Sequence, residues 1–355
     1  MKKIVLTGGG TAGHVTPNLA LIPRLQDDGW EVHYIGGGDS PEQELISKCS
    51  GVTFYPISVG KLRRYFDPKN FTDPFRVLHG VFQATRIIRR IRPNVVFSKG
   101  GFVSVPVVYG AKLNGVPIVT HESDMTPGLA NKLSAPFARV ECCTFPEAVK
   151  FCRGKGVHTG TPIRPELLAG SRESGLRRFG FNDSRPVLMV VGGSSGAQSI
   201  NAVVCEALPK LLETFQVLHL VGKGNSNSGY NGTENYKQVE YLNEEMADAY
   251  ACADIVVSRA GSNALCELLA ARKPALLIPY PKSASRGDQL LNAESFRSRG
   301  LSHVLLQEDM TPQTLVDAIV KLYYDRGRLY EAMNNETNIN GIDAVLEQIY
   351  KYARP

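Results

Sequence analysis

Two stretches of sequence decide the fold: IVLTGGGTAGH at residues 4–14 and VLMVVGGSSGA at residues 187–197. In each stretch, an apolar run leads into a loop with almost no side chains, and a helical pattern follows. A loop of this kind lets backbone N–H groups and a helix N-terminus approach an anionic ligand closely. One such turn indicates a nucleotide-binding domain, and two of them, one at the start of each half, predict two domains of this type.

The length and composition are those of a two-domain globular protein. A chain of 355 residues is too long for one ordinary domain, and its hydrophobic content of 43% is typical of globular proteins. The apolar run after Met1 stops at Gly8, and no stretch approaches the roughly 20 apolar residues that span a bilayer. Seven cysteines without a CxxC pair indicate reduced core thiols and disfavour a zinc site. We therefore expect a cytoplasmic protein with no signal peptide, no transmembrane helix and no bound metal.

The positive charge is concentrated in residues 61–92, which hold nine Lys and Arg against two Asp, while the whole chain has a net charge of +6. This concentration argues against a nucleic-acid-binding protein, whose basic residues spread over a larger face. Within the segment, helical spacing places four apolar residues on one side: Phe75, Leu78, Val81 and Phe82. This stripe either faces the core or forms an interfacial patch for an anionic membrane. Nearby basic residues favour the patch: Lys61, Arg63 and Arg64.

Strands and helices alternate along both halves of the chain. In the first half we expect strands at 3–7, 31–36, 94–98, 116–120 and 139–144, and helices near 16–28, 41–49, 74–92, 104–114 and 127–135. In the second half we expect strands near 187–192, 216–221, 237–241, 254–258, 275–279 and 303–306. This order predicts an α/β protein with two Rossmann-like domains, each built on a parallel sheet. We place the domains at 1–163 and 164–336, with the terminal segment 337–355 packing back onto the first domain.

The first turn also matches the GxGxxG spacing of dinucleotide-binding domains, through Gly8, Gly10 and Gly13. An NAD(P)-dependent oxidoreductase is therefore one alternative. Two features weaken it. Residues 36–38 are glycines where an acidic residue is expected, and the second half carries another phosphate-type loop.

His14 follows the first glycine loop at the start of a predicted helix. A helix N-terminus disfavours the protonated imidazole, so a neutral His14 could accept a hydroxyl proton as a general base. The alternative is that His14 caps the turn or bonds to the backbone. Position alone leaves both interpretations open.

Two more polar loops follow strands of the first half, at the sheet edge where ligands bind. SKGGFVSVP at 98–106 is a third glycine loop. THESDMTPG at 120–128 contains a helix cap, which explains Thr126 but not Glu122. We therefore single out Glu122 as a candidate functional residue.

The second half repeats this arrangement. Gly261 and Ser262 open a helix whose N-terminus suits a phosphate. Glu267 could hold a ribose diol through two hydrogen bonds, or it could be a solvated helix residue. Asp288 and Gln289 could recognise sugar hydroxyls, although Asp288 alone could be a helix cap.

Taken in order, the motifs resemble those of the MurG family, the N-acetylglucosaminyltransferases of bacterial peptidoglycan synthesis. The resemblance extends over nearly the whole chain. It rests on these stretches: GGGTAGHVTPNLAL, GKLRRY, SKGGFVSVP, THESDMTPGLANK, GTPIR, GGSSGAQSIN, SRAGSNALCELLA and SRGDQLLNAESF.

The resemblance implies a GT-B fold and an inverting glycosyltransferase. The enzyme would move N-acetylglucosamine from UDP-GlcNAc to the 4-hydroxyl of the MurNAc-pentapeptide of undecaprenyl-pyrophosphate lipid I, forming lipid II. It would act in cell wall biogenesis, cell shape and cell division, as a peripheral protein on the cytoplasmic face of the membrane. Its partners would be UDP-GlcNAc, lipid I, an anionic membrane surface and cell-wall synthesis proteins. The absence of a DxD motif agrees with a transferase that needs no catalytic metal or cofactor.

The resemblance also implies roles for individual residues. His14 is the leading catalytic residue and Glu122 the second. The donor would be bound by Thr11, Gly13, His14, Asn131, Arg164, Ser194, Leu242, Gly261, Ser262, Glu267, Asp288 and Gln289. The lipid pyrophosphate would be bound by Gly9, Gly10, Gly100, Gly101, Lys61, Arg63 and Arg64. The membrane patch would be Phe75, Leu78 and Phe82.

The sequence departs from the family pattern at several positions, including the replacement of HEQN by HESD at residues 121–124. Ala12 replaces a glycine, Ser195 a glutamine, Asp124 an amide, and Asp288 a His or Gln. These departures concern the sugar contacts and leave the reaction class unchanged. Two further alternatives are another GT-B UDP-sugar transferase with a different lipid acceptor, and a membrane-bound sugar-nucleotide sensor without turnover.

Overall fold

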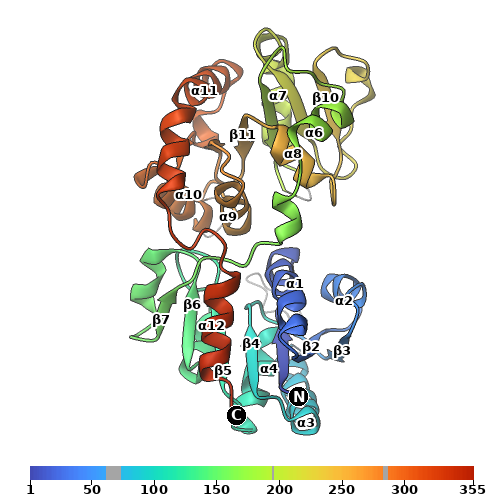
Figure 1. Cartoon of the computed structure of the whole chain (residues 1–355), viewed down its shortest axis with the longest axis vertical. Coiled ribbons are helices and arrows are strands. Elements are labelled where there is room, and N and C mark those ends of the chain that lie inside the picture. Colours follow the sequence, from blue (N-terminus) through green and yellow to red (C-terminus); the bar gives the residue numbers. More distant parts are fainter. Residues whose placement is uncertain (61–72, 194–195, 283–286) are drawn as a thin grey trace. The chain divides into compact units, whose positions relative to one another are not determined.

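Each of the two glycine turns begins a separate parallel sheet in the computed structural model, which describes residues 1–60, 73–193, 196–282 and 287–355 (Figure 1). The chain divides into two units. The first contains Met1–Arg164 together with Asn340–Pro355, and the second contains Pro165–Ile339. The predicted fold class, two Rossmann-like domains with parallel sheets, is confirmed.

Among its described residues, the first unit forms a seven-stranded parallel sheet in the order β3-β2-β1-β4-β5-β6-β7. The strands are β1 (Lys3–Thr7), β2 (Glu31–Gly37), β3 (Val52–Ile57), β4 (Val95–Ser98), β5 (Ile118–Glu122), β6 (Val140–Cys143) and β7 (Gly156–His158). Thr7, the last residue of β1, pairs in register with Ile35 and with Ser98. The loops that follow these strands therefore leave the sheet at the same edge.

Helices cover both faces of this sheet. They are α1 (Ala12–Asp27), α2 (Pro41–Ser47), α3 (Asp73–Ile91), α4 (Ser104–Leu113), α5 (Leu129–Ser134) and α12 (Ile342–Tyr352), with the 3-10 turns η2 (Ala135–Phe137) and η3 (Pro146–Phe151). Ile4 and Leu6 of β1 pack in the core that α1 and α12 share, whereas Val5 packs in the core beneath α3 and α4. Alternate side chains of one strand thus fill two separate cores.

The last helix, α12, belongs to the first unit and packs on the same core as α1 (Figure 1). Val345 and Ile349 are fully buried there. Tyr350 stacks on Trp30 with ring centroids 5.5 Å apart, and Arg24 of α1 pairs with Asp343 at 3.3 Å. These contacts join the end of the chain to its beginning.

The described part of the second unit forms a six-stranded parallel sheet in the order β10-β9-β8-β11-β12-β13. The strands are β8 (Val187–Val191), β9 (Gln216–Leu220), β10 (Tyr236–Val239), β11 (Ile255–Ser258), β12 (Ala275–Leu277) and β13 (Ser302–Val304). The helices and 3-10 turns are η4 (Pro165–Leu168), α6 (Arg172–Phe179), α7 (Gln198–Leu211), η5 (Ser228–Tyr230), α8 (Met246–Cys252), α9 (Ser262–Ala270), α10 (Asp288–Ser298), η6 (Gln307–Asp309) and α11 (Pro312–Asn334). Apolar side chains of α7 and α11 share a core with β8, β9, β11 and β12.

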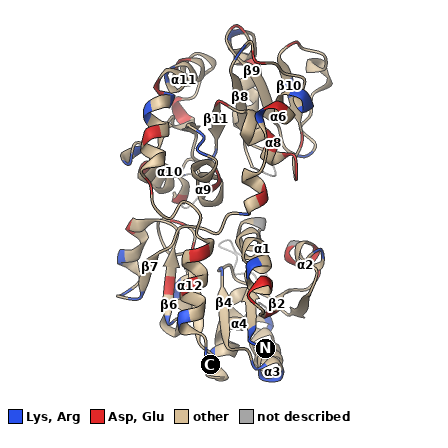
Figure 2. Ribbon diagram, in the orientation of Figure 1, with Lys and Arg blue, Asp and Glu red and all other residues tan. Residues whose placement is uncertain are grey.

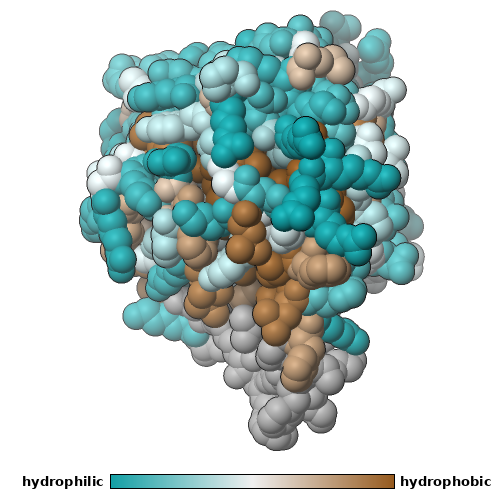
Figure 3. Space-filling view, turned by 90° about the horizontal axis from the view of Figure 1, so that it is seen from below, coloured by the Kyte–Doolittle hydropathy of each residue, from teal (hydrophilic) through white to brown (hydrophobic). Residues whose placement is uncertain are grey.

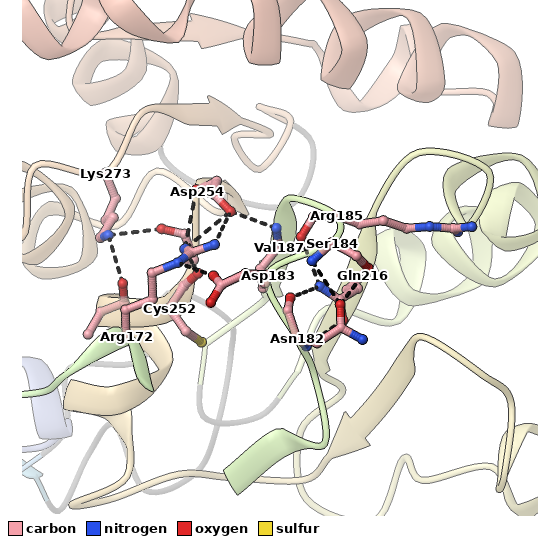
Figure 4. Close-up of polar contacts among 12 residues, drawn as sticks. Arg172, Asn182, Asp183, Ser184, Arg185, Val187, Gln216, Cys252, Asp254 and Lys273 are labelled. Carbon is pink, nitrogen blue, oxygen red and sulfur yellow. Dashed lines mark hydrogen bonds and ion pairs between the residues drawn. The ribbon is translucent and has the colours of Figure 1, made fainter. Parts of the chain in front are cut away.

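A polar cluster fixes the amino-terminal edge of the second sheet (Figure 4). Asp254, just before β11, accepts a hydrogen bond from the backbone N–H of Val187 at 2.7 Å and pairs with Arg172 of α6 at 3.3 Å. Lys273 donates to the carbonyl of Ala253 at 2.8 Å. Because the cluster lies where the strands begin, it stabilises the sheet at the edge opposite the glycine turn.

Several element limits differ from the sequence expectations. The strand expected at 116–120 runs from Ile118 to Glu122, and α1 begins at Ala12 rather than at residue 16. The expectations omitted β3 and β7, which are edge strands of the first sheet. β7 has only three residues, and β3 contains Pro56, which weakens a strand pattern.

Candidate functional site

The first candidate site lies at the carboxyl edge of the first sheet, where the loop after β1 meets the loop after β4. His14 is the third residue of α1, and its Nδ1 lies 2.9 Å from Oγ1 of Thr11. Gly101, which lies in the loop after β4 and has φ of +82°, packs its backbone against the loop after β1. A Cβ there would come within 2.3 Å of the Gly9 carbonyl oxygen and within 3.4 Å of His14 Nδ1. The contact therefore requires glycine, and it brings the predicted catalytic histidine beside the predicted pyrophosphate loop.

Glu122 ends β5 and is held within its own loop. One carboxylate oxygen accepts the N–H of Asp124 at 3.0 Å, and the other accepts the N–H of Gly128 at 3.1 Å and the Asn131 amide at 2.7 Å. Burial raises the pKa of Glu122, while these hydrogen bonds oppose the shift. The arrangement suits a carboxylate that orders its loop and orients Asn131.

Asn131, on α5, presents an acceptor toward the third glycine loop. Its Nδ2 donates hydrogen bonds to the His121 carbonyl at 3.1 Å and to the Glu122 carboxylate. Its buried Oδ1 has no hydrogen-bond partner among the described residues. A Cβ at Gly100 would lie 2.9 Å from this Oδ1. A buried acceptor without a partner is costly, so a hydroxyl or amide of a ligand would satisfy it.

Two charged residues of this edge were missed by the sequence reasoning. Glu42, on α2, is 1% exposed and accepts the N–H groups of Gly10 at 3.3 Å and of Gly37 at 3.2 Å. Lys99 is fully buried after β4, and its Nζ donates to the hydroxyl of Ser123. Glu42 resembles an ordinary acidic residue of a first helical turn, and only its distance to two remote glycines shows its role.

The second candidate site lies at the carboxyl edge of the second sheet. Gly261 is the N-cap of α9, and apart from its chain neighbours no described atom lies within 4 Å of the position of a Cβ there. Glu267, on α9, accepts a hydrogen bond from the hydroxyl of Tyr250 at 3.3 Å. Gln289, on α10, accepts the N–H of Tyr280 at 3.1 Å.

The remaining donor candidates lie as follows. Ser262 is half-buried at the start of α9, Leu242 is 8% exposed after β10, and Asp288 is the first residue of α10. Arg164 is exposed at the end of the first unit, and Thr11 and Gly13 are exposed at the start of α1. Ser194, together with the variant position Ser195, lies outside the described residues.

Arg259 is a second-unit residue that the sequence reasoning missed. It is 5% exposed, its guanidinium lies 4.1 Å from the ring centroid of Tyr280, and it donates to Ser199 Oγ at 2.9 Å. Burial lowers its pKa, and its Nε has no hydrogen-bond partner among the described residues. Arg259 and Tyr280 line a cavity of about 340 Å³ beside the glycine turn after β8. A guanidinium in this cavity suits an anionic ligand.

The predicted membrane patch is exposed on α3. Phe75, Leu78 and Phe82 are 74%, 66% and 58% exposed, and Leu113 at the end of α4 adds a fourth exposed side chain at 68%. Figure 3 looks onto this end of the first unit and shows hydrophobic residues gathered among hydrophilic ones, and Figure 2 marks the basic residues of α3. The core-facing alternative is therefore wrong for these three residues. The side of α3 that packs inward carries Gly80, and a Cβ added at Gly80 would lie 2.2 Å from the Ser58 carbonyl oxygen. Three predicted basic residues lie outside the described residues: Lys61, Arg63 and Arg64.

No group of three or more His, Cys, Asp or Glu side chains among the described residues is arranged to hold a metal ion. In the same part of the chain, every helix is too short or too polar to cross a membrane.

Comparison with known proteins identifies the family. Residues 4–142 match the glycosyltransferase family 28 N-terminal domain, and residues 187–349 match the glycosyltransferase family 28 C-terminal domain. The chain belongs to glycosyltransferase family 28. The family resemblance and the GT-B fold inferred from the motifs are therefore confirmed. Membership of this family favours sugar transfer over the hydride transfer that the GxGxxG spacing also allowed.

Relatives within family 28 match the full length. A protein of Lachnospira eligens is 54% identical over 98% of this chain and 99% of its own, and one of Clostridium tetani is 52% identical over 99% and 98%. Both are named UDP-N-acetylglucosamine–N-acetylmuramyl-(pentapeptide) pyrophosphoryl-undecaprenol N-acetylglucosamine transferase. The crystal structure of Acinetobacter baumannii MurG covers 99% of this chain and all of its own, with 26% identity and a TM-score of 0.78.

Proposed function

We propose that this family 28 enzyme transfers N-acetylglucosamine from UDP-N-acetylglucosamine to the 4-hydroxyl of the MurNAc-pentapeptide of lipid I, forming lipid II. The observation that carries the proposal is the 54% identity, over 98% of the chain, to a relative named for this reaction. The proximity of His14 to Gly101, where an added Cβ would lie 3.4 Å from His14 Nδ1, supports it, because the reaction needs a base near a loop suited to a pyrophosphate.

In the proposed reaction, the acceptor 4-oxygen attacks C1 of the sugar as the bond from C1 to UDP breaks, which inverts the configuration to β. His14 takes the hydroxyl proton. In the tautomer whose Nδ1–H donates to Thr11 Oγ1, Nε2 carries the lone pair that receives this proton. Glu122 ranks second as a base. Its three hydrogen bonds support a positioning role, in which it orients Asn131 toward the sugar.

The second unit holds the donor in this proposal. The α9 N-terminus at Gly261 and Ser262 receives the diphosphate, and Glu267 accepts hydrogen bonds from the ribose hydroxyls. Arg259 adds a buried cation to the same sheet edge. Helix N-termini and cations such as Arg164 can stabilise departing UDP without a metal ion.

The test is UDP release from UDP-GlcNAc with a short-chain lipid I analogue, measured with and without EDTA. Release that requires the acceptor and resists EDTA is expected. Binding of UDP-GlcNAc without acceptor-dependent release would instead favour the sensor alternative or another lipid acceptor. Release that EDTA abolishes would retain the reaction and refute the metal-free mechanism.

We also propose that the exposed stripe Phe75, Leu78 and Phe82 binds the enzyme to an anionic membrane surface. Replacing Phe75 and Phe82 with Asp should weaken sedimentation with phosphatidylglycerol vesicles at least tenfold, because two largely exposed aromatic rings lose their burial in lipid. Tyr324→Asp is the matched control, since Tyr324 is 80% exposed on α11 of the other unit. Equal vesicle binding by the wild type and the double variant would remove the patch assignment.

A further inference from the structure

A cavity of about 430 Å³ opens on the flank of the first unit, between α5, η3 and the start of β6 and β7. Its apolar walls are Pro127, Pro136 and the 45% exposed ring of Phe151. It shares no lining residue with the His14 loop or with the α3 stripe.

The charge of this cavity is positive. Lys132, Arg153 and Lys155 line it, against a single lining carboxylate, Glu141. Lys132 and Arg153 are exposed, and neither forms an ion pair within 4 Å with any described residue. Lys155 donates one hydrogen bond, to the Ala138 carbonyl at 3.0 Å. Glu141 is 8% exposed; burial raises its pKa, and the charges of Lys155 and Arg153 oppose this shift.

The cavity adjoins the first candidate site. Thr126 and Pro127 in its wall belong to the loop whose backbone N–H groups bind Glu122. Strand β6 lies two places from β4 in the sheet, which corresponds to a sideways separation of about 10 Å at the usual strand spacing. Glu141 is in register with Ser98 through Thr120, so Gly100 lies two residues, about 7 Å, further along the strand direction. An extended pentapeptide spans about 17 Å. A peptide on a sugar held at the Gly100–Gly101 loop can therefore reach the cavity.

We propose that this cavity binds the peptide stem of the acceptor, with its terminal carboxylate between Lys132 and Arg153. This inference rests on the proposed function, because the pentapeptide is part of the acceptor in the names of the relatives. An excess of cations around an opening with proline and phenylalanine walls matches a ligand that carries both carboxylate and apolar groups. The chemistry of the lining thus gives the enzyme a means to select acceptors by their peptide.

The first experiment compares two lipid I analogues, one with a free peptide carboxylate and one with a C-terminal amide. For the wild type, amidation should raise the acceptor KM about tenfold. The double variant Lys132→Gln/Arg153→Gln should raise the KM of the free acid about tenfold and leave that of the amide unchanged. Its kcat and its KM for UDP-GlcNAc should match the wild type. Equal losses on both acceptors would overturn the proposal.

The matched control is Arg139→Gln, which removes an exposed positive charge just before β6 without lining the cavity. It should behave as the wild type with both acceptors. If Arg139→Gln raised the KM of the free-acid acceptor as the double variant does, the effect would come from the overall positive charge and not from this cavity, and the proposal would fail.

A binding measurement separates this inference from the proposed function. MurNAc-pentapeptide without pyrophosphate or lipid should bind the wild type about tenfold more tightly than the double variant, as measured by calorimetry. Peptide-dependent binding without GlcNAc transfer would refute the proposed function and retain the cavity. Transfer with equal peptide affinity in both proteins would refute the cavity and retain the function.

Discussion

Replacing Glu42 tests whether a buried carboxylate holds the loop that carries the catalytic candidate. Glu42 connects the glycine turn after β1 with the end of β2, through the N–H groups of Gly10 and Gly37. The approach is close, because a Cβ at Gly9 would lie 2.5 Å from Oε1 of Glu42. In Glu42→Ala both amides lose this acceptor.

The expected loss of stability follows from where these amides lie. Gly37 is buried, so its unpaired N–H costs about 1–3 kcal/mol, whereas Gly10 is exposed and can bond to water at a cost near 1 kcal/mol or less. Release of a desolvated carboxylate offsets part of this cost. We expect a net loss of about 2 kcal/mol, which corresponds to a Tm of the first unit lower by about 4–8 °C.

The same change should impair catalysis. The loop leads directly into α1 and His14, and a shift of about 1 Å at a catalytic group can cost about 100-fold in rate. We expect kcat of Glu42→Ala to fall at least tenfold, with little change in the KM for UDP-GlcNAc. Glu42→Gln, which keeps one acceptor oxygen, should lie between the alanine variant and the wild type.

The assays are thermal unfolding, amide hydrogen exchange at Gly37, and acceptor-dependent UDP release. Glu44→Ala is the control, because Glu44 lies in the same helical turn but forms only an exposed pair with Lys48 at 3.4 Å. Such a pair contributes at most about 0.5 kcal/mol. If Glu42→Ala kept the wild-type Tm, Gly37 protection and kcat, the carboxylate would not hold the loop and the reasoning would be refuted.

Three further changes test other parts of the structure. His14→Ala should lower kcat by about 100-fold or more with near-normal affinity for UDP-GlcNAc, and unchanged turnover would exclude His14 as the base. Glu267→Ala should raise the donor KM about tenfold by removing hydrogen bonds to the ribose, and an unchanged KM would remove that assignment. Burial lowers the pKa of His219 to about 4 from 6.5, so the unfolded state binds more protons between these values. The free energy of unfolding should therefore fall as the pH drops from 6.5 to 4, measured by urea unfolding, and the slope should flatten in His219→Gln. The same slope in that variant would assign the pH dependence to other groups.

The sheet and its glycine turns could be predicted from the sequence because they depend on local patterns. Buried parallel strands such as β1 and β8 are continuous apolar runs, and each is followed by a turn with a glycine at positive φ, Gly10 and Gly193. The edge strands β3 and β7 escaped prediction because one contains a proline and the other has three residues. Their pairing depends on the neighbouring strand more than on their own sequence.

The candidate site was less predictable, because its important contacts join distant residues. Lys99 and Arg259 stand in the sequence beside glycine and alanine, and their burial follows only from how the loops pack. The α3 stripe shows the same limit. Its helical spacing was evident, but the choice of outward face depends on the close packing of Gly80 against the Ser58 backbone.

Asp124 differs from the amide of the family pattern, but the hydrogen bond that residue 124 contributes to Glu122 comes from its backbone. The loop is held through the backbone N–H groups of Asp124 and Gly128, which both donate to Glu122, and through the amide of Asn131. A backbone donor is the same whether residue 124 carries a carboxylate or an amide. Substitution at this position can therefore alter the charge offered to a ligand while these backbone hydrogen bonds remain. Glu122 has no such freedom, since its two oxygens accept all three bonds, so its replacement should disorder Asn131 and the loop together.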